Sequence, residues 1–336
     1  DKGEGSEWAE WFPADWISES FPGQFRNWFY SMLAMGAALE KTEPFRATFT
    51  YALLRDEHGE EMHKSKGNAI WFEDAADKMG VDVMRWMYSR HTPANNMNFG
   101  YHIGDEVRRK FMIPLWNVYS FFITYANLDG WDPATATEPK EKPELDRWIL
   151  SETHLLTRRV TESLERWRPE EAAMHVEGYV DALSNWYVRR SRRRFWTSDG
   201  EAPDASAYWT LYNCLTTLSH LLAPFTPFVT EAIYGNLVAG KVPGAPDSVH
   251  LGDWPIADED AINEELSAAV EIVRRMVSLG RSARSTAQIR VRQPLATALL
   301  IPRTSEERLR LQRLSAQIAE ELNVKSVEVA EEGGDR

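Results

Sequence analysis

The chain has 336 residues, of which 43% are hydrophobic and 26% are charged, and it contains 14 tryptophans. This length fits two or three domains, and the composition is that of a globular protein, which excludes a short peptide module and a largely disordered chain. With 38 basic and 51 acidic residues, the formal net charge is -13. That charge argues against a generally cationic nucleic-acid binder, although it is compatible with a local basic patch.

Cys214 is the single cysteine, and the eight histidines show no metal-ligand spacing such as H-E-x-x-H. An intramolecular disulfide and a cysteine-rich zinc site are therefore excluded, and we predict no structural metal. No apolar run reaches the roughly 18 to 20 residues of a membrane span, and residues 1–10 lack the pattern of a signal peptide. We expect a cytoplasmic protein without a membrane partner. Because the chain starts at Asp1 without an initiator methionine, we also expect it to be part of a longer protein.

The first part of the chain alternates helical and extended patterns. Apolar residues at three- and four-residue steps predict a helix over 24–40, and a run of β-branched and aromatic residues predicts a strand over 48–54. A tight turn is predicted over 56–61, centred on Gly59, and a second helix over 72–80. These are the ingredients of about half an α/β domain.

The remainder of the chain is predicted to be mainly helical. Residues 132–143 contain three prolines and mixed charge, which predicts a linker. Long apolar periodicities from 144 to about 236 predict an all-α helical bundle. A helix over 262–284 is then followed by a strand, a helix and a strand that form a small α/β unit, over 296–302, 305–322 and 324–329.

The polar segment 61–68 lies between the predicted strand and the second helix. It contains two lysines, a hydroxyl group, a glycine and an amide: Lys64, Lys66, Ser65, Gly67 and Asn68. Together such groups can neutralise and hydrogen-bond a polyphosphate. By composition alone, an ordinary solvated loop with surface lysines is the more frequent explanation.

The residues around this segment favour a polyphosphate-binding loop over an ordinary solvated loop. Met62, Lys64 and Ser65 match three positions of a K-M-S-K-S signature, and Gly67-Asn68 match the G-N that follows it. In these motifs the chain resembles the class I aminoacyl-tRNA synthetases of the isoleucine, valine, leucine and methionine group. Other matching stretches agree in order and spacing: Pro13-Ala14-Asp15, the Q-x-R-G-W-F-like Gln24 to Tyr30, and Gly80-Val81-Asp82 leading to Arg85. We name residues 61–68 the signature loop.

A second group of motifs resembles the isoleucyl members of this family. The stretch 183–196 is similar to their anticodon-binding domain, and 321–325 is typical of them. Five arginines lie within six positions of the first stretch, at 189, 190, 192, 193 and 194. Such a cluster suits phosphate contact. The alternative is that it forms ion pairs with acidic neighbours, and we expect several of the five to do so.

The resemblance implies a fold and an activity. Residues 1–131 would be the C-terminal half of a Rossmann-like nucleotide-binding domain, 144–256 an anticodon-binding bundle, and 257–336 a junction helix with a small α/β unit. The parent chain would be a monomeric ligase that activates isoleucine with ATP and Mg²⁺ and transfers it to tRNA. The implied catalytic residues are Lys64 and Ser65, the ATP or adenylate ligands are Glu19, Gln24, Trp28, Lys64, Lys66 and Asn68, and the tRNA ligands are Trp186, Arg189, Arg190, Arg193 and Arg194. From helix periodicity alone, Trp28 fits a core position equally well.

Some features depart from the family pattern. Glu61 and His63 replace the first lysine and the first serine of the signature, and Asn27 stands where a glycine precedes the tryptophan. The half of the nucleotide fold that carries the second signature, H-I-G-H, is missing, and we interpret Tyr101 to Asp105 as a chance match to it. We therefore expect the fragment alone to be inactive.

Two other functions stay open. One is a tRNA-binding module or a degenerate synthetase paralogue without catalysis of its own. The other is a purely structural helical protein, which would account for the bundle but not for the ordered motifs.

Overall fold

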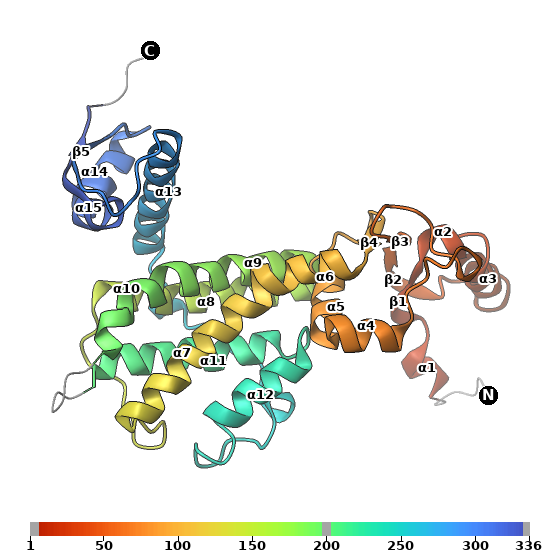
Figure 1. The fold of residues 1–336 in the computed structure, drawn as a ribbon. Coiled ribbons are helices and arrows are strands. Elements are labelled where there is room, and N and C mark those ends of the chain that lie inside the picture. Colours follow the sequence, from red (N-terminus) through yellow and green to blue (C-terminus); the bar gives the residue numbers. More distant parts are fainter. Residues whose placement is uncertain (1–6, 197–202, 332–336) are drawn as a thin grey trace. The chain divides into compact units, whose positions relative to one another are not determined.

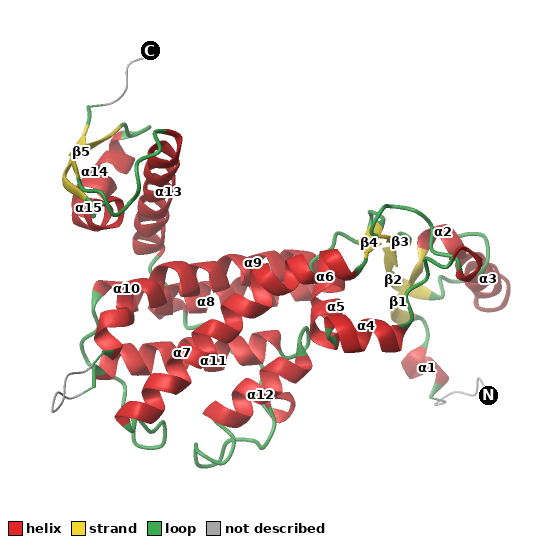
Figure 2. Ribbon diagram, in the orientation of Figure 1, coloured by secondary structure: helices red, strands yellow, loops and turns green. Residues whose placement is uncertain are grey.

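A computed structural model describes residues 7–196 and 203–331. The chain divides into two compact units. Unit 1 comprises Asp1–Pro139 and Leu156–Ile256, and unit 2 comprises Lys140–Leu155 and Ala257–Arg336. Helices predominate in both units (Figures 1 and 2). In the part of the chain that the structure describes, each helix is too short or too polar to cross a lipid bilayer.

The N-terminal part of unit 1 contains two parallel strand pairs. β1 (Ala14–Ser20) pairs with β2 (Phe45–Tyr51), and β3 (Leu54–Asp56) pairs with β4 (Met97–Phe99). The helices before and between these strands are α1 (Trp8–Trp11), α2 (Phe21–Gln24), α3 (Trp28–Met35), the π-helical η1 (Gly36–Glu40), the short 3-10 helix η2 (Lys64–Lys66), α4 (Phe72–Met79) and α5 (Val81–Ser89). Each pair is therefore a strand–helix–strand unit, and the described strands do not form one continuous sheet.

The strand predicted over 48–54 is wrong in its limits. β2 starts and ends three residues earlier, and the chain passes into β3 after a break at Ala52 and Leu53. At this break the Ala52 amide donates to the Pro93 carbonyl (2.8 Å) and the Leu53 amide to Asn96 Oδ1 (3.0 Å). The backbone thus changes partner from β1 to the β4 side, and one predicted strand becomes two.

The helix predicted over 24–40 is also interrupted. Asn27 has non-helical backbone angles, and Gln24 Oε1 accepts a hydrogen bond from the Trp28 amide (3.3 Å), where α3 begins. The predicted turn at Gly59 is confirmed, since this residue has a φ of 84° that favours glycine. The predicted helix after the signature loop is confirmed as α4.

The rest of unit 1 is a helical bundle. Its helices and helical turns are α6 (Tyr101–Val107), the π-helical η3 (Arg108–Met112), α7 (Ile113–Asp129), α8 (Glu144–Glu165), whose first part belongs to unit 2, α9 (Pro169–Asp181), the π-helical η4 (Ala182–Val188), α10 (Arg189–Ser191), the 3-10 helices η5 (Arg192–Phe195) and η6 (Val249–Leu251), α11 (Ala205–Leu222) and α12 (Pro227–Leu237). Large aromatic side chains fill its core, and Trp86, Tyr187 and Tyr208 are fully buried. Burial of this apolar area is the main stabilising contribution.

Unit 2 combines helices with the third parallel strand pair. Beside the start of α8 it contains η7 (Glu259–Ala261), α13 (Glu264–Thr286), β5 (Leu295–Leu300), α14 (Ser305–Arg313), α15 (Ser315–Leu322) and β6 (Val324–Val329), and β5 pairs with β6. The predicted strand–helix–strand order is confirmed, with the helix divided in two.

A buried arginine connects α13 with both strands of unit 2. Arg284 is only 5% exposed, and its guanidinium donates to the carbonyls of Arg290 (3.2 Å), Gln293 (3.0 Å), Leu322 (2.7 Å) and Asn323 (3.2 Å). These carbonyls precede β5 and β6. A buried charge is tolerated here because each of these bonds replaces hydration.

We predict that Arg284→Ala lowers the free energy of unfolding of unit 2 by about 3 kcal/mol, because the carbonyls lose a charged donor inside the protein. Urea unfolding followed by circular dichroism, with amide exchange in β5 and β6, measures this loss. Arg292→Ala is the matched control, since Arg292 is exposed. Equal stability of the two variants would contradict the assigned role of Arg284.

Candidate functional site

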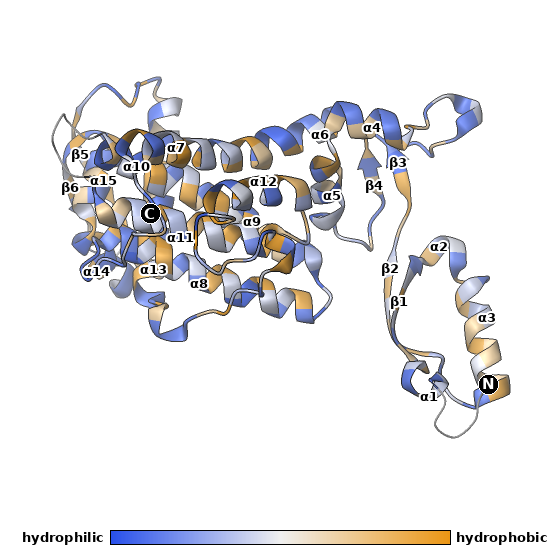
Figure 3. Cartoon of the chain, turned by 90° about the horizontal axis from the view of Figure 1, so that it is seen from below, coloured by the Kyte–Doolittle hydropathy of each residue, from blue (hydrophilic) through white to orange (hydrophobic). Residues whose placement is uncertain are grey.

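The signature loop follows β3 and precedes α4. It begins with an antiparallel bridge between Arg55 and Glu61 and makes one 3-10 turn, η2, which ends at Gly67 with a φ of 72°. Figure 3 shows this connection as a hydrophilic segment between β3 and α4. Because Gly67 lies in the left-handed region, a residue with a side chain would be strained there.

Asp56, the last residue of β3, holds both ends of the loop. Its Oδ1 accepts from the amides of His58 (3.0 Å) and Glu60 (2.8 Å), and its Oδ2 accepts from Asn68 Nδ2 (2.8 Å). Asn68 in turn accepts from the His63 amide (2.9 Å) and donates to the Glu61 carbonyl (3.1 Å). The backbone of the loop is therefore fixed by one carboxylate and one amide side chain.

The cations of the loop, Lys64 and Lys66, are exposed, and so is Ser65. Lys64 Nζ lies 4.6 Å from the centre of the Trp71 ring, a cation–π contact at the start of α4. The arrangement offers two ammonium groups and a hydroxyl group to an anion on a backbone that is already ordered.

The residues implied for the adenylate lie on β1, on α2 and at the start of α3. Glu19 Oε1 accepts from the Tyr51 hydroxyl (3.1 Å) and from the Ser20 amide (2.7 Å). Gln24 Oε1 accepts from the Trp28 amide at the start of α3, and Trp28 is 39% exposed. The exposure of Trp28 excludes a buried core position for its side chain.

Tyr51 is a residue that the sequence reasoning missed. It is the last residue of β2, stands opposite Ser20 of β1, and lines an apolar pocket of about 420 Å³ together with Phe49, Tyr88 and His91. Burial and the hydrogen bond to Glu19 raise the pKa of Tyr51. Its position at the carboxyl end of a parallel strand is the signal that could have identified it.

The two groups of candidate residues are separate. Among the described residues, the side-chain contacts of the signature loop go to Asp56 and Trp71, whereas Glu19 contacts Tyr51. Within residues 7–196 and 203–331, no hydrogen bond or ring contact joins the signature loop to the residues implied for the adenylate. Each group therefore offers its polar atoms independently to a ligand.

In the arginine-rich stretch, the structure separates structural residues from exposed ones. Trp186 is 5% exposed, and the guanidinium groups of Arg190 and Arg189 lie 5.3 Å and 5.8 Å from its ring. Arg194 binds Asp204 through Nε (2.8 Å) and Nη2 (3.1 Å). The expectation that several of the five serve as intramolecular partners is confirmed for Arg189, Arg190 and Arg194, of which Arg194 forms an ion pair.

Asp204 has two structural tasks. It accepts from the Ala207 amide (3.0 Å) as the N-cap of α11 and also binds Arg194. Burial acts to raise the pKa of Asp204, but the hydrogen bonds from Arg194 and Ala207 outweigh it and lower the pKa below its ordinary value. Arg194 is therefore committed to the fold of the bundle.

Arg192, Arg193 and Trp196 form the exposed part of this stretch. Trp196 is 57% exposed, and its Nε1 donates to the Tyr125 hydroxyl (2.8 Å). An exposed indole held in place beside exposed guanidinium groups can stack on a base while phosphates bind nearby. Trp196 was not among the residues implied for tRNA binding, whereas the buried Trp186 was.

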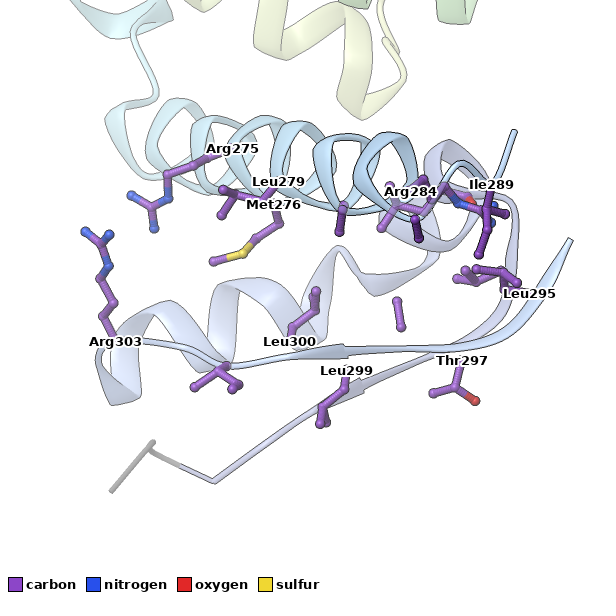
Figure 4. Close-up of a pocket in the computed structure, with 17 residues that line it drawn as sticks. Arg275, Met276, Leu279, Arg284, Ile289, Leu295, Thr297, Leu299, Leu300 and Arg303 are labelled. Atoms are coloured by element: carbon purple, nitrogen blue, oxygen red, sulfur yellow. The ribbon is translucent and has the colours of Figure 1, made fainter. Parts of the chain in front are cut away.

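Two further features, the turn that starts α6 and a pocket of unit 2, lie outside these two groups. Tyr101 to Asp105 form the first turns of α6, where a Cβ at Gly104 would lie 2.6 Å from Met79 Sδ, so close helix packing accounts for this glycine. In unit 2 a pocket of about 550 Å³ lies between α13 and β5, with Arg275 and Arg303 at one end (Figure 4). Within the described residues, no cluster of three or more His, Cys, Asp or Glu side chains could hold a metal ion.

Two family descriptions match the chain. "tRNA synthetases class I (I, L, M and V)" matches residues 2–100, which include the signature loop, and "Anticodon-binding domain of tRNA ligase" matches residues 146–299, which include the arginine-rich stretch. By these two matches, the chain is homologous to class I tRNA synthetases of this group.

Within the class, the chain is a homologue of the isoleucine–tRNA ligases. It is 47% identical over 323 residues to that of Dehalococcoides mccartyi and 42% identical over 326 residues to that of Thermus thermophilus. The matches cover 96% of this chain but 32% and 31% of those proteins. The chain thus spans about a third of the length of these relatives.

Solved structures share the fold. The agnB2 LeuRS of Agrobacterium radiobacter K84, in a ternary complex with tRNA and LeuAMS, has a TM-score of 0.56 at 21% identity over 75% of this chain and 29% of that chain. Mycobacterium tuberculosis methionyl-tRNA synthetase with methionyl-adenylate has a TM-score of 0.58 at 20% identity over 75% of this chain and 53% of that chain.

We predict that Asp56→Asn accelerates amide exchange of His63 several-fold, because an amide nitrogen in place of Asp56 Oδ2 cannot accept from Asn68 Nδ2, and Asn68 holds the His63 amide. The hydrogen bond from Asn68 lowers the pKa of Asp56 below its ordinary value of 3.8. The same loosening is therefore expected in the unsubstituted chain as the pH falls below that value, while the anchor is complete above it.

Hydrogen exchange followed by mass spectrometry measures both effects. Asp77→Asn, an exposed aspartate of α4, is the matched control. Unchanged exchange in Asp56→Asn would show that the loop is ordered by other contacts.

Proposed function

We propose that this chain is the C-terminal part of an isoleucine–tRNA ligase. Residues 1–131 supply the second half of a Rossmann-like catalytic domain, 132–143 a linker, 144–256 the anticodon-binding bundle, and 257–336 a junction helix with a small α/β unit. The observation that carries this proposal is the signature loop, whose backbone is fixed by Asp56 while Lys64 and Lys66 stay exposed. We expect the protein to act in the cytoplasm, as a monomer.

In the proposed reaction, a carboxylate oxygen of isoleucine attacks the α-phosphate of ATP, and pyrophosphate leaves. A hydroxyl group at the tRNA 3′ end then attacks the carbonyl carbon of the adenylate, and AMP leaves. Negative charge builds on the leaving pyrophosphate, and Lys64 would bind it, supported by Ser65 and Lys66. Mg²⁺ would enter with ATP and be bound mostly by phosphate oxygens.

Glu19, Gln24 and Trp28 would contact the adenylate or the amino acid, with Tyr51 orienting the Glu19 carboxylate through its 3.1 Å hydrogen bond. Asn68 would act on the phosphate side chiefly by shaping the signature loop. Glu61 and His63, which replace a lysine and a serine of the signature, lie 3.4 Å apart as a pair. Lys66 would supply the second cation in place of the one missing at position 61.

The arginine-rich stretch would contact tRNA. Arg193, with Arg192 and Trp196, offers an exposed surface, while Arg189, Arg190 and Arg194 would act partly through the bundle that they stabilise. A second candidate function, tRNA binding without catalysis, is favoured by one observation. In the part of the chain that the structure describes, the two groups of nucleotide-binding candidates share no side-chain contact, and each would need further partners.

For the intact ligase that contains these residues, we predict that Lys64→Ala slows isoleucine-dependent ATP–pyrophosphate exchange by roughly 30- to 1000-fold, equivalent to about 2 to 4 kcal/mol of transition-state stabilisation. Lys78→Ala is the control, because the Lys78 ammonium pairs with Asp74 on the surface (3.7 Å) and lies 5.2 Å from the centre of the Tyr101 ring, and it is not part of the signature loop. Exchange that is equal in the two variants would refute the role of Lys64.

For the chain itself, we predict that Trp196→Ala weakens tRNA binding by about 1 to 3 kcal/mol through loss of base stacking. Trp254→Ala is the matched control, since its indole is also exposed and donates to a hydroxyl group, Thr161 Oγ1 (2.8 Å). Affinity measured by filter binding should also fall steeply with salt. A flat salt response would count against the arginines as the RNA contact.

A further inference from the structure

Glu61 and His63, the two residues that depart from the signature, form a pair at the start of the signature loop. His63 Nε2 lies 3.4 Å from Glu61 Oε2, and both side chains are exposed. Met62, which lies between them in sequence and matches the signature, is half-buried. The two departures from the signature are therefore one change in space, a carboxylate beside an imidazole.

The backbone directs both side chains of the pair to the same face. His63 has extended backbone angles (φ -132°, ψ 136°), and Glu61 forms the antiparallel bridge with Arg55. In an extended segment, residues two positions apart carry their side chains on one face, and the residue between them faces the other way. Asn68 fixes this geometry, because it binds the His63 amide (2.9 Å) and the Glu61 carbonyl (3.1 Å).

An imidazole in this position gives the loop a charge that depends on pH. Histidine is the only side chain whose unperturbed charge change falls between pH 5 and 8. With a neutral ring the pair carries the negative charge of Glu61, which repels a phosphate group, and with a protonated ring the pair is neutral. Protonation therefore adds a third cation to the two ammonium groups of Lys64 and Lys66.

Other charged groups close to the pair in the chain have partners of their own. The Asp56 oxygens accept from two loop amides and one side-chain amide, Arg55 Nη1 donates to a carbonyl of the turn (3.0 Å), and Asp74 pairs with a lysine of α4 (3.7 Å). Among the described residues, the ion-pair partner of His63 is Glu61 alone. The remaining charged residues of this region are exposed: Glu57, His58, Glu60, Lys64, Lys66 and Glu73.

We propose that protonated His63 is a third cationic phosphate ligand of the signature loop, and that Glu61 is the counter-ion which the phosphate replaces. The inference rests on the proposed function, because it requires that this loop binds the pyrophosphate part of ATP. When the ligand arrives, His63 Nε2–H donates to a phosphate oxygen in place of the carboxylate. Pyrophosphate carries more negative charge than one carboxylate, so its binding favours the protonated ring and takes up protons. The affinity therefore rises as the pH falls.

Isothermal titration calorimetry of this chain with inorganic pyrophosphate, without Mg²⁺, tests the assignment. Titrations in two buffers of different ionisation enthalpy give the number of protons taken up on binding. Pyrophosphate itself titrates in this range, so the value for His63→Ser, which restores the serine of the signature, is subtracted. Between pH 8 and pH 6 we expect the affinity of the unsubstituted chain to rise roughly three- to tenfold more than that of His63→Ser.

Two further variants distinguish the charge of the ring from its shape and its surroundings. His63→Lys carries its charge at both pH values, so it should lose the excess proton uptake and bind at pH 8 more tightly than the unsubstituted chain. His102→Ser is the matched control, because His102 forms a similar exposed pair with Glu106 (3.7 Å) on α6. This control should retain the full excess proton uptake.

The outcomes separate the inference from the proposed function. A chain that binds no pyrophosphate, or binds it equally well in Lys64→Ala, refutes the phosphate role of the signature loop and with it the role of His63. Binding that Lys64→Ala weakens, but whose proton uptake is the same in His63→Ser, overturns the role of His63 alone. An imidazole C2 proton resonance of His63 that pyrophosphate does not shift would overturn it as well.

Discussion

The packing of α5 on the helical bundle is the constraint on which the candidate active site depends. Trp86 is fully buried between aromatic neighbours, and its Nε1 donates to Glu177 Oε1 (3.0 Å), which also binds Arg90 (3.1 Å). An indole with its faces covered and its N–H bonded has one favourable orientation. Since α4 and the signature loop precede α5 with only Gly80 as a joint, they inherit that orientation.

Charged residues divide into two classes at both candidate sites. In the first class, Asp56 accepts a hydrogen bond from Asn68 and Arg194 forms an ion pair with Asp204. In the second class, Lys64 and Arg193 are exposed. The first class orders the backbone before any ligand arrives, so that binding requires little additional loss of conformational entropy. This division also explains how a chain with a net charge of -13 can offer basic surfaces: acidic residues neutralise the structural cations locally.

Local patterns predicted the local elements, and errors arose where distant residues decide. The turn at Gly59, α4 and the strands β5 and β6 follow from nearby residues alone. The break between β2 and β3 depends on Pro93 and Asn96, some forty residues away in sequence. α7 was missed because its apolar residues show no clear period, and Trp186 was assigned to tRNA because its motif cannot reveal that the side chain is buried.

The strand ends explain why the nucleotide-binding candidates can act together although they do not touch. Glu19, Tyr51 and Asp56 lie at the carboxyl ends of β1, β2 and β3, and β1 and β2 are parallel and in register from Ala14 and Phe45 to Ser20 and Tyr51. Ligands of α/β proteins bind beyond such strand ends. The short connection from Tyr51 at the end of β2 to Leu54 at the start of β3 therefore joins the residues implied for the adenylate to the signature loop along the chain. A partner that completes the site would have to meet the ends of two strand pairs, because Glu19 and Tyr51 lie on one pair and Asp56 on another.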